Sequence, residues 1–184
     1  MPATRTGLNN IVPTSITSSG SPTINNTTGR VTFSNVSGSG VYFNGVFSDS
    51  YDNYLVVFDL NPVSSTYPLI RFSSSGSPDS TNYWYHTQFH YNSTVTFRGS
   101  GTTASTTGIE LGRSVTVFNK YVYIASPFLS DKETTILAEG VGAYSNASSE
   151  YTVGLHEVKS SFDGFVLDWG ANITGTISVY GYTK

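Results

Sequence analysis

The chain has no cysteine among its 184 residues, which excludes disulfides, thiolate metal sites and cysteine nucleophiles together. Charged residues are also scarce, at 11% against about 25% in an average soluble domain. The formal net charge of −3 is dispersed and forms none of the cationic clusters on which nucleic-acid binding depends. Ser, Thr, Asn and Gly must therefore cover most of the surface, and such weak self-repulsion mildly favours a protein that works inside an assembly.

Long apolar runs are absent as well. No window of the sequence approaches the roughly 18 apolar residues that cross a bilayer. The first residues, Met1-Pro2-Ala3-Thr4-Arg5, lack the charged start and apolar stretch of a secretory signal. We therefore expect no membrane partner and no export by an ordinary signal peptide.

Aromatic residues, in contrast, are abundant, with 13 Tyr and 11 Phe, and side chains of this kind favour strands. Short apolar runs alternate with turn residues at the spacing of a sandwich or barrel, while no stretch has a helical period. The expected strands are 30–35, 41–47, 54–60, 69–73, 83–91, 94–98, 115–125, 134–144, 151–159, 165–168 and 173–182. The sequence predicts one all-β domain at 30–184, an antiparallel, jelly-roll-like β-sandwich.

Residues 1–29 differ from the rest in composition. They are mostly Ser, Thr, Asn, Gly and Pro, with apolar residues such as Ile11, Ile16 and Ile24 in no regular period. Alone, such a segment buries too little apolar surface to offset its ordering entropy. We expect a flexible N-terminal arm, either a disordered tail or a segment that becomes ordered on a neighbouring subunit.

The histidines are weak candidates for metal ligands. His86 and His90 are four residues apart in a strand-like stretch, where that spacing spans roughly 13 Å. Zinc ligands lie about 2 Å from the metal, so the two could share an ion only across a bulge or bend. His156 is isolated in the sequence. We expect no metal and no cofactor.

The acidic residues do not form a recognisable catalytic pair. Residues 48–53 are rich in oxygen ligands, but Asp, Ser and Asn are also the ordinary residues of turns. A glycosidase needs two carboxylates facing each other across a cleft, and Glu110, Glu139, Asp163 and Asp168 cannot be paired from sequence alone. Neither a Gly-x-Ser-x-Gly elbow nor a phosphate-cradling glycine loop occurs. We predict no catalytic residues and no enzyme.

A carbohydrate site is harder to exclude. The run Tyr83-Trp84-Tyr85 places the tryptophan on one face of a strand and both tyrosines on the other. One of these sets could be exposed and stack on a sugar, although a core Trp84 with half-buried tyrosines is the favoured interpretation.

Several segments resemble, in the same order, structural proteins of tailed bacteriophages. In residues 43–57 a turn with Tyr51 and Tyr54 leads into an apolar strand. Residues 70–73 come before a Gly/Ser loop, residues 83–85 follow it, and residues 173–182 resemble the closing strand of that group. The resemblance covers the chain from Val41 onward and implies a virion surface β-sandwich, usually a homotrimer, of tail-fibre or head-decoration type.

The short region before the domain distinguishes these two types. A tail fibre usually carries a long shaft there, whereas a decoration protein needs only a sandwich and a short arm. We therefore expect a capsid decoration (cement) protein on the virion surface, a homotrimer that bridges subunits of the major capsid protein through residues 1–29. The alternatives are a tail-fibre or tail component that binds host polysaccharide, and a carbohydrate-binding module outside a virion.

Overall fold

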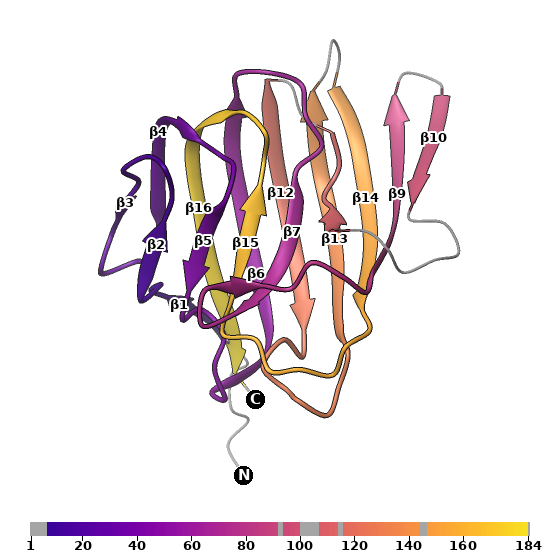
Figure 1. Ribbon diagram of the computed structural model, residues 1–184. Coiled ribbons are helices and arrows are strands. Elements are labelled where there is room, and N and C mark those ends of the chain that lie inside the picture. The colour runs from indigo at the N-terminus through magenta and orange to yellow at the C-terminus, as the bar shows by residue number, and fades with distance from the viewer. Residues whose placement is uncertain (1–6, 92–93, 100–106, 114–115, 144–146, 184) are drawn as a thin grey trace.

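In the computed structural model, residues 7–91, 94–99, 107–113, 116–143 and 147–183 are described. They form an all-β, antiparallel sandwich of two packed sheets (Figure 1), as the sequence predicts. No helix long and apolar enough to cross a membrane occurs among them.

The larger sheet has ten strands and runs in the order β10-β9-β14-β13-β12-β6-β16-β4-β3, with β1 also paired to β16. Its strands are β1 (Leu8–Ile11), β3 (Thr23–Ile24), β4 (Val31–Ser37), β6 (Tyr51–Pro62), β9 (Tyr83–Tyr91), β10 (Thr94–Gly99), β12 (Val117–Ala125), β13 (Thr134–Ala143), β14 (Ala147–His156) and β16 (Asn172–Thr183). The smaller sheet runs in the order β11-β7-β15-β5-β2, with β8 paired to β7. Its strands are β2 (Ser15–Thr17), β5 (Val41–Asn44), β7 (Leu69–Ser74), β8 (Ser77–Pro78), β11 (Ile109–Glu110) and β15 (Gly164–Asp168).

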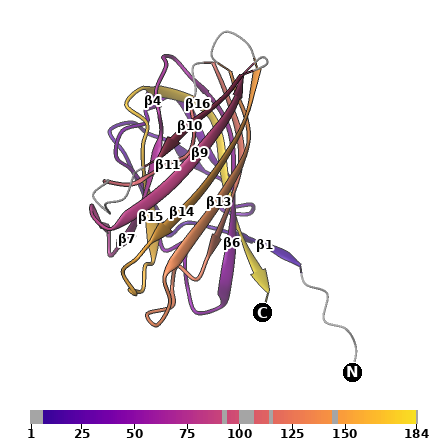
Figure 2. The ribbon, with the colours of Figure 1, turned by 90° about the vertical axis from the view of Figure 1, so that its right-hand side faces the viewer.

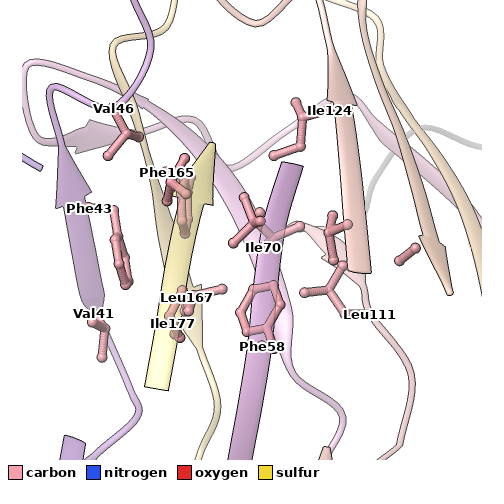
Figure 3. Close-up of a cluster of buried hydrophobic side chains, with 14 of the residues drawn as sticks. Val41, Phe43, Val46, Phe58, Ile70, Leu111, Ile124, Phe165, Leu167 and Ile177 are labelled. Carbon is pink, nitrogen blue, oxygen red and sulfur yellow. The ribbon is translucent and has the colours of Figure 1, made fainter. Parts of the chain in front are cut away.

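Alternation along the strands builds the core between the two sheets. In β16, Ile177 and Val179 are buried in it, and the intervening Ser178 points to the opposite face. Rings from both sheets meet there: Phe43 and Phe165 of the small sheet stack at 4.6 Å between centroids, and Phe58 of the large sheet belongs to the same cluster (Figure 3). The period-two pattern of the sequence therefore specifies which side chains the sandwich encloses.

The N-terminal segment differs from the expected arm. Residues 7–29 lie along their own sandwich, where β1 extends the large sheet beside β16 (Figure 2), β2 pairs with β5, and β3 pairs with β4. The physical reason is the spaced apolar residues: Ile11, Ile16 and Ile24 are partly buried and pack against the core. Attachment of this segment to a neighbouring subunit stays a prediction.

Candidate functional site

Most of the large apolar side chains that are exposed in the described part of the chain lie on the outer face of the large sheet. The small sheet covers only the inner face, so the outward side chains of β9, β10, β12, β13 and β14 have no layer over them (Figure 2). Large apolar side chains on this face are exposed by 41 to 58%. They are Val95, Phe97, Tyr121, Val141, Tyr151 and Val153. We call this surface the outer face.

Cross-strand register explains why these side chains gather. Tyr121 on β12 is paired with Glu139 on β13, which is paired with Tyr151 on β14, so the three lie in one row across the sheet. Val153 continues the adjacent row beside Leu137. Neighbouring rows of one face lie within contact distance, so these apolar side chains lie near one another, with polar residues such as Glu139 and Gln88 between them.

The outer face carries little charge. Asp59 and Glu139 are the charged residues at its described outward positions, and no Lys or Arg occurs at those positions. Two grooves of about 430 and 500 Å³ hollow it, one beside Trp84 and Val153 and the other beside Tyr123 and Leu137. The side chains of the outer face are therefore mostly apolar or uncharged polar groups.

A second feature lies inside the sandwich near β9, β10 and β14. There, buried charged and polar side chains interrupt the apolar core. Lys120 on β12 and Glu150 on β14 point inward among apolar neighbours, and their Nζ and Oε2 atoms are 2.7 Å apart with both side chains almost fully buried. Burial lowers the pKa of Lys120 below its ordinary value, and the charge of Glu150 partly offsets this. The Glu150 carboxylate also accepts hydrogen bonds from the Ser148 hydroxyl at 2.9 Å and the Arg113 backbone N–H at 3.1 Å.

Two glycines make room for this ion pair. A Cβ at Gly112 would lie 2.2 Å from Glu150 Oε2 and 2.8 Å from Lys120 Nζ, and the φ of +121° at Gly112 already disfavours any side chain. A Cβ at Gly142 would lie 2.5 Å from Glu150 Oε1. The backbone thus passes close to the carboxylate on two sides.

A second carboxylate, that of Glu110 on β11, lies in the same region. Its oxygens are 3.1 Å and 3.2 Å from Arg98 Nε, and the Tyr85 hydroxyl donates to it at 3.4 Å. Burial raises the pKa of Glu110, and Arg98 reduces that effect without removing it. The Arg98 guanidinium in turn lies 3.9 Å above the ring of Tyr67, a cation–π contact.

Some of these groups line a pocket of about 300 Å³. Its lining consists of Tyr67, Phe89, Thr96, Arg98, Arg113, Ser148 and Glu150. Arg113 reaches it from the chain after β11, with its guanidinium 5.6 Å from the Tyr67 ring and its Nε donating to Ser65 Oγ at 3.4 Å. Each buried carboxylate has a cationic partner, so the arrangement suits recognition of a ligand better than attack by a carboxylate nucleophile.

The residues singled out in the sequence lie apart from this pocket or take other roles. His86 and His90 lie on β9 and are both exposed on the outer face. His156 is fully buried, with Nε2 3.2 Å from Asp79 Oδ2 and its ring packed 4.5 Å from that of Tyr83. No group of three or more potential ligands for a metal ion occurs in the described ranges.

The four carboxylates that the sequence could not pair are dispersed. Glu110 is buried beside Arg98, Glu139 lies on the outer face, Asp163 accepts from the Ser75 backbone, and Asp168 pairs with Arg71 at 3.4 Å. None of the four shares a cleft with another.

The favoured interpretation of Trp84 was wrong. Tyr83 is the fully buried member of the run, while Trp84 points to the outer face and is only partly covered. Side chains along β9 alternate between the core and the outer face. Tyr83 takes a core position, where its hydroxyl accepts a hydrogen bond from the Phe72 N–H at 2.9 Å, and Trp84 therefore points outward.

Sequence reasoning missed Lys120, Glu150, Arg98, Arg113 and Tyr67. One signal was present: Lys120 occupies the inward phase of the alternating run Phe118, Lys120, Val122, Ile124. A lysine at a core position requires a buried partner, although the pattern does not say which acid supplies it.

Comparison of this chain with protein-family models, with curated proteins and with solved structures gives no match.

Proposed function

We propose that this chain is a structural protein of a virion surface, a capsid decoration protein whose copies assemble through the outer face. The observation that carries the proposal is an uncovered apolar sheet face in a protein with very little charge. An exposed apolar patch of this size is often functional in soluble proteins. The resemblance of residues 43–57 and 173–182 to phage structural proteins supplies the virion context and the trimeric state.

The size of the patch suits a second copy as its occupant. With aromatic and valine side chains exposed by 41 to 58%, the six residues present on the order of 500 Å² of apolar surface. A standard interface buries about 800 Å² per partner, of which about 60% is apolar. The outer face therefore has about the apolar area that one partner contributes to a stable interface. Its tyrosine hydroxyls provide hydrogen-bond donors for Asp59 and Glu139.

The N-terminal segment supports the bridging part of the proposal. Strands β1, β2 and β3 contain four, three and two residues, so each is held by few backbone hydrogen bonds. In the particle, residues 1–29 leave their own sheet edges and add to those of the neighbouring capsid subunits by the same kind of backbone pairing. A trimer carries three such segments, and engagement of one raises the effective concentration of the others.

A tail component that contacts host polysaccharide is the second candidate function. The observation that favours it is the pocket with Arg98, Arg113 and Tyr67, because aromatic and guanidinium groups together suit a saccharide.

The copy number of the chain in purified particles separates the two candidates. Quantitative mass spectrometry against the major capsid protein is expected to give comparable numbers if the chain decorates the shell. A number many-fold lower would reject decoration and support the tail. Absence from the particles would reject both.

A further inference from the structure

The pocket at the polar end of the sandwich has features of a small-molecule site. At about 300 Å³ it is at the lower end of the range of ligand pockets. It is open to solvent at Arg98, whose side chain is 44% exposed, and it ends at the buried Glu150. A ligand of about one sugar residue in size fits such a volume.

The charges around the pocket favour an anion with a single charge. Two guanidinium groups line it, those of Arg98 and Arg113, against one carboxylate, that of Glu150. Outside the lining, Lys120 pairs with Glu150 and Glu110 pairs with Arg98, and the charges of Lys120 and Glu110 cancel. The sum is +1, so one negative charge brings the cluster to neutrality. A dianion such as phosphate would add a second negative charge close to Glu150, and electrostatic repulsion in a poorly hydrated site opposes that.

The cluster is not explained by stability. Buried ion pairs are often replaceable by apolar side chains with no loss of stability, and apolar and aromatic side chains make up the main cluster of this core. Here, in addition, positions 112 and 142 are glycines, and a Cβ at either position would clash with the carboxylate of Glu150. Such a costly arrangement next to an open pocket indicates a recognition role.

We propose that this pocket binds a polyhydroxylated monocarboxylate of the size of a uronic acid residue. The guanidinium groups of Arg98 and Arg113 face the pocket and bind the carboxylate, since a planar guanidinium matches its two oxygens. Thr96, whose exposed side chain also lines the pocket, bonds to a sugar hydroxyl. The ring of Phe89 supplies an apolar wall on which the C–H face of the sugar packs, while the Tyr67 ring supports the Arg98 guanidinium. This inference holds whether the chain sits on a capsid or a tail.

Calorimetric titration of the full chain with sodium glucuronate at constant ionic strength tests the proposal, with glucose and inorganic phosphate as comparison probes. Saturable binding of glucuronate is expected, tighter than that of either comparison probe. Arg113→Gln removes one charge-assisted contact and should weaken glucuronate binding about tenfold. Thr96→Val should weaken it several-fold.

Arg30→Gln is the matched control, because Arg30 is exposed and does not line the pocket. It removes the same charge and should leave the affinity within about twofold of the wild type. Unchanged melting temperatures establish that the variants are folded. The proposal is overturned if glucuronate does not bind saturably, if phosphate or glucose binds as tightly, or if Arg30→Gln weakens binding as much as Arg113→Gln.

Discussion

Lys120 and Glu150 form the most enclosed ion pair among the described residues. The stability of the folded protein depends on both side chains of the pair being present. Each charge alone would be buried without compensation, because apolar side chains such as Val122 and Phe118 fill the same face of β12. Breaking a buried pair on one side is therefore far more damaging than replacing both members.

Lys120→Met should lower the free energy of unfolding by about 3–5 kcal/mol, since it leaves the Glu150 carboxylate buried without its cation. The double variant with Glu150→Leu should recover most of that loss. Urea denaturation measures both, with the exposed Lys132→Met as control, for which a change within about 0.5 kcal/mol is expected. Equal losses in the single and double variants would contradict this account.

Gly112 is expected to tolerate alanine poorly. Gly112→Ala places a Cβ against Glu150 Oε2 in addition to adopting a positive φ. Gly40 provides the control, because it also has a positive φ but a Cβ there would meet only Tyr42 at 3.7 Å. Gly40→Ala should cost about 1–2 kcal/mol, and thermal unfolding should show a clearly larger loss for Gly112→Ala. Equal losses would mean that the carboxylate simply moves aside.

The raised pKa of Glu110 predicts a pH dependence of stability. Its ordinary value is 4.5, and burial places the folded-state pKa above that. The folded state therefore holds the proton more tightly, and the stabilisation is fully present below pH 4.5 and is lost as the pH rises through the folded pKa. The stability of the wild type relative to Glu110→Gln should thus fall with rising pH over this range, as urea titrations at several pH values can measure. A difference that stays flat or rises would refute the assignment.

At the scale of elements, the N-terminal strands and β10 differ from the rest in how weakly they are held. Strands β1 to β3 are short edge additions, and all six residues of β10 are exposed. The central strands β6, β12, β13 and β16 are paired on both sides. Exposed backbone hydrogen bonds and few buried contacts characterise the segments that open first.

Deletion of residues 1–29 should leave a folded sandwich that no longer stays on particles. The half-buried Ile11, Ile16 and Ile24 contribute about 2–4 kcal/mol of unfolding free energy, and that contribution is lost without loss of the core. Denaturation of the truncated chain and its co-sedimentation with particles check the two parts. Retention on particles would contradict bridging by this segment, and failure to fold would show that the segment belongs to the domain itself.

At the scale of the whole molecule, the outer face determines the proposed assembly. A chain of 19.8 kDa with this face exposed has the apolar surface of one half of a stable interface. Its low charge also provides little repulsion between copies.

Tyr121→Glu should convert the assembly into monomers of 19.8 kDa. The new carboxylate lies directly across from Glu139 on the next strand, and its burial between copies is unfavourable. Light scattering measures the mass in solution, and Ser77→Glu, at an exposed position on β8 of the small sheet, should leave the assembly intact. A wild type that is monomeric at high concentration would reject the outer face as a self-interface.

The sequence by itself determined the all-β class and most of the strands. Alternation in runs such as Phe118 to Ile124 and the turn residues between them are local properties, and β9 and β16 lie within a residue of their expected bounds. In β16 the same alternation places Ile177 and Val179 in the core.

Only the tertiary structure decided where residues 7–29 lie, which acid pairs with Lys120, and which face of the sandwich stays uncovered. Each of these depends on which strands become neighbours, such as β14 beside β9 and β13. A period of two tells which side chains share a face, but it does not tell which distant strand lies next to them or whether a second sheet covers them. The pocket and the outer face therefore depend on the spatial order of the strands, which the local sequence pattern does not specify.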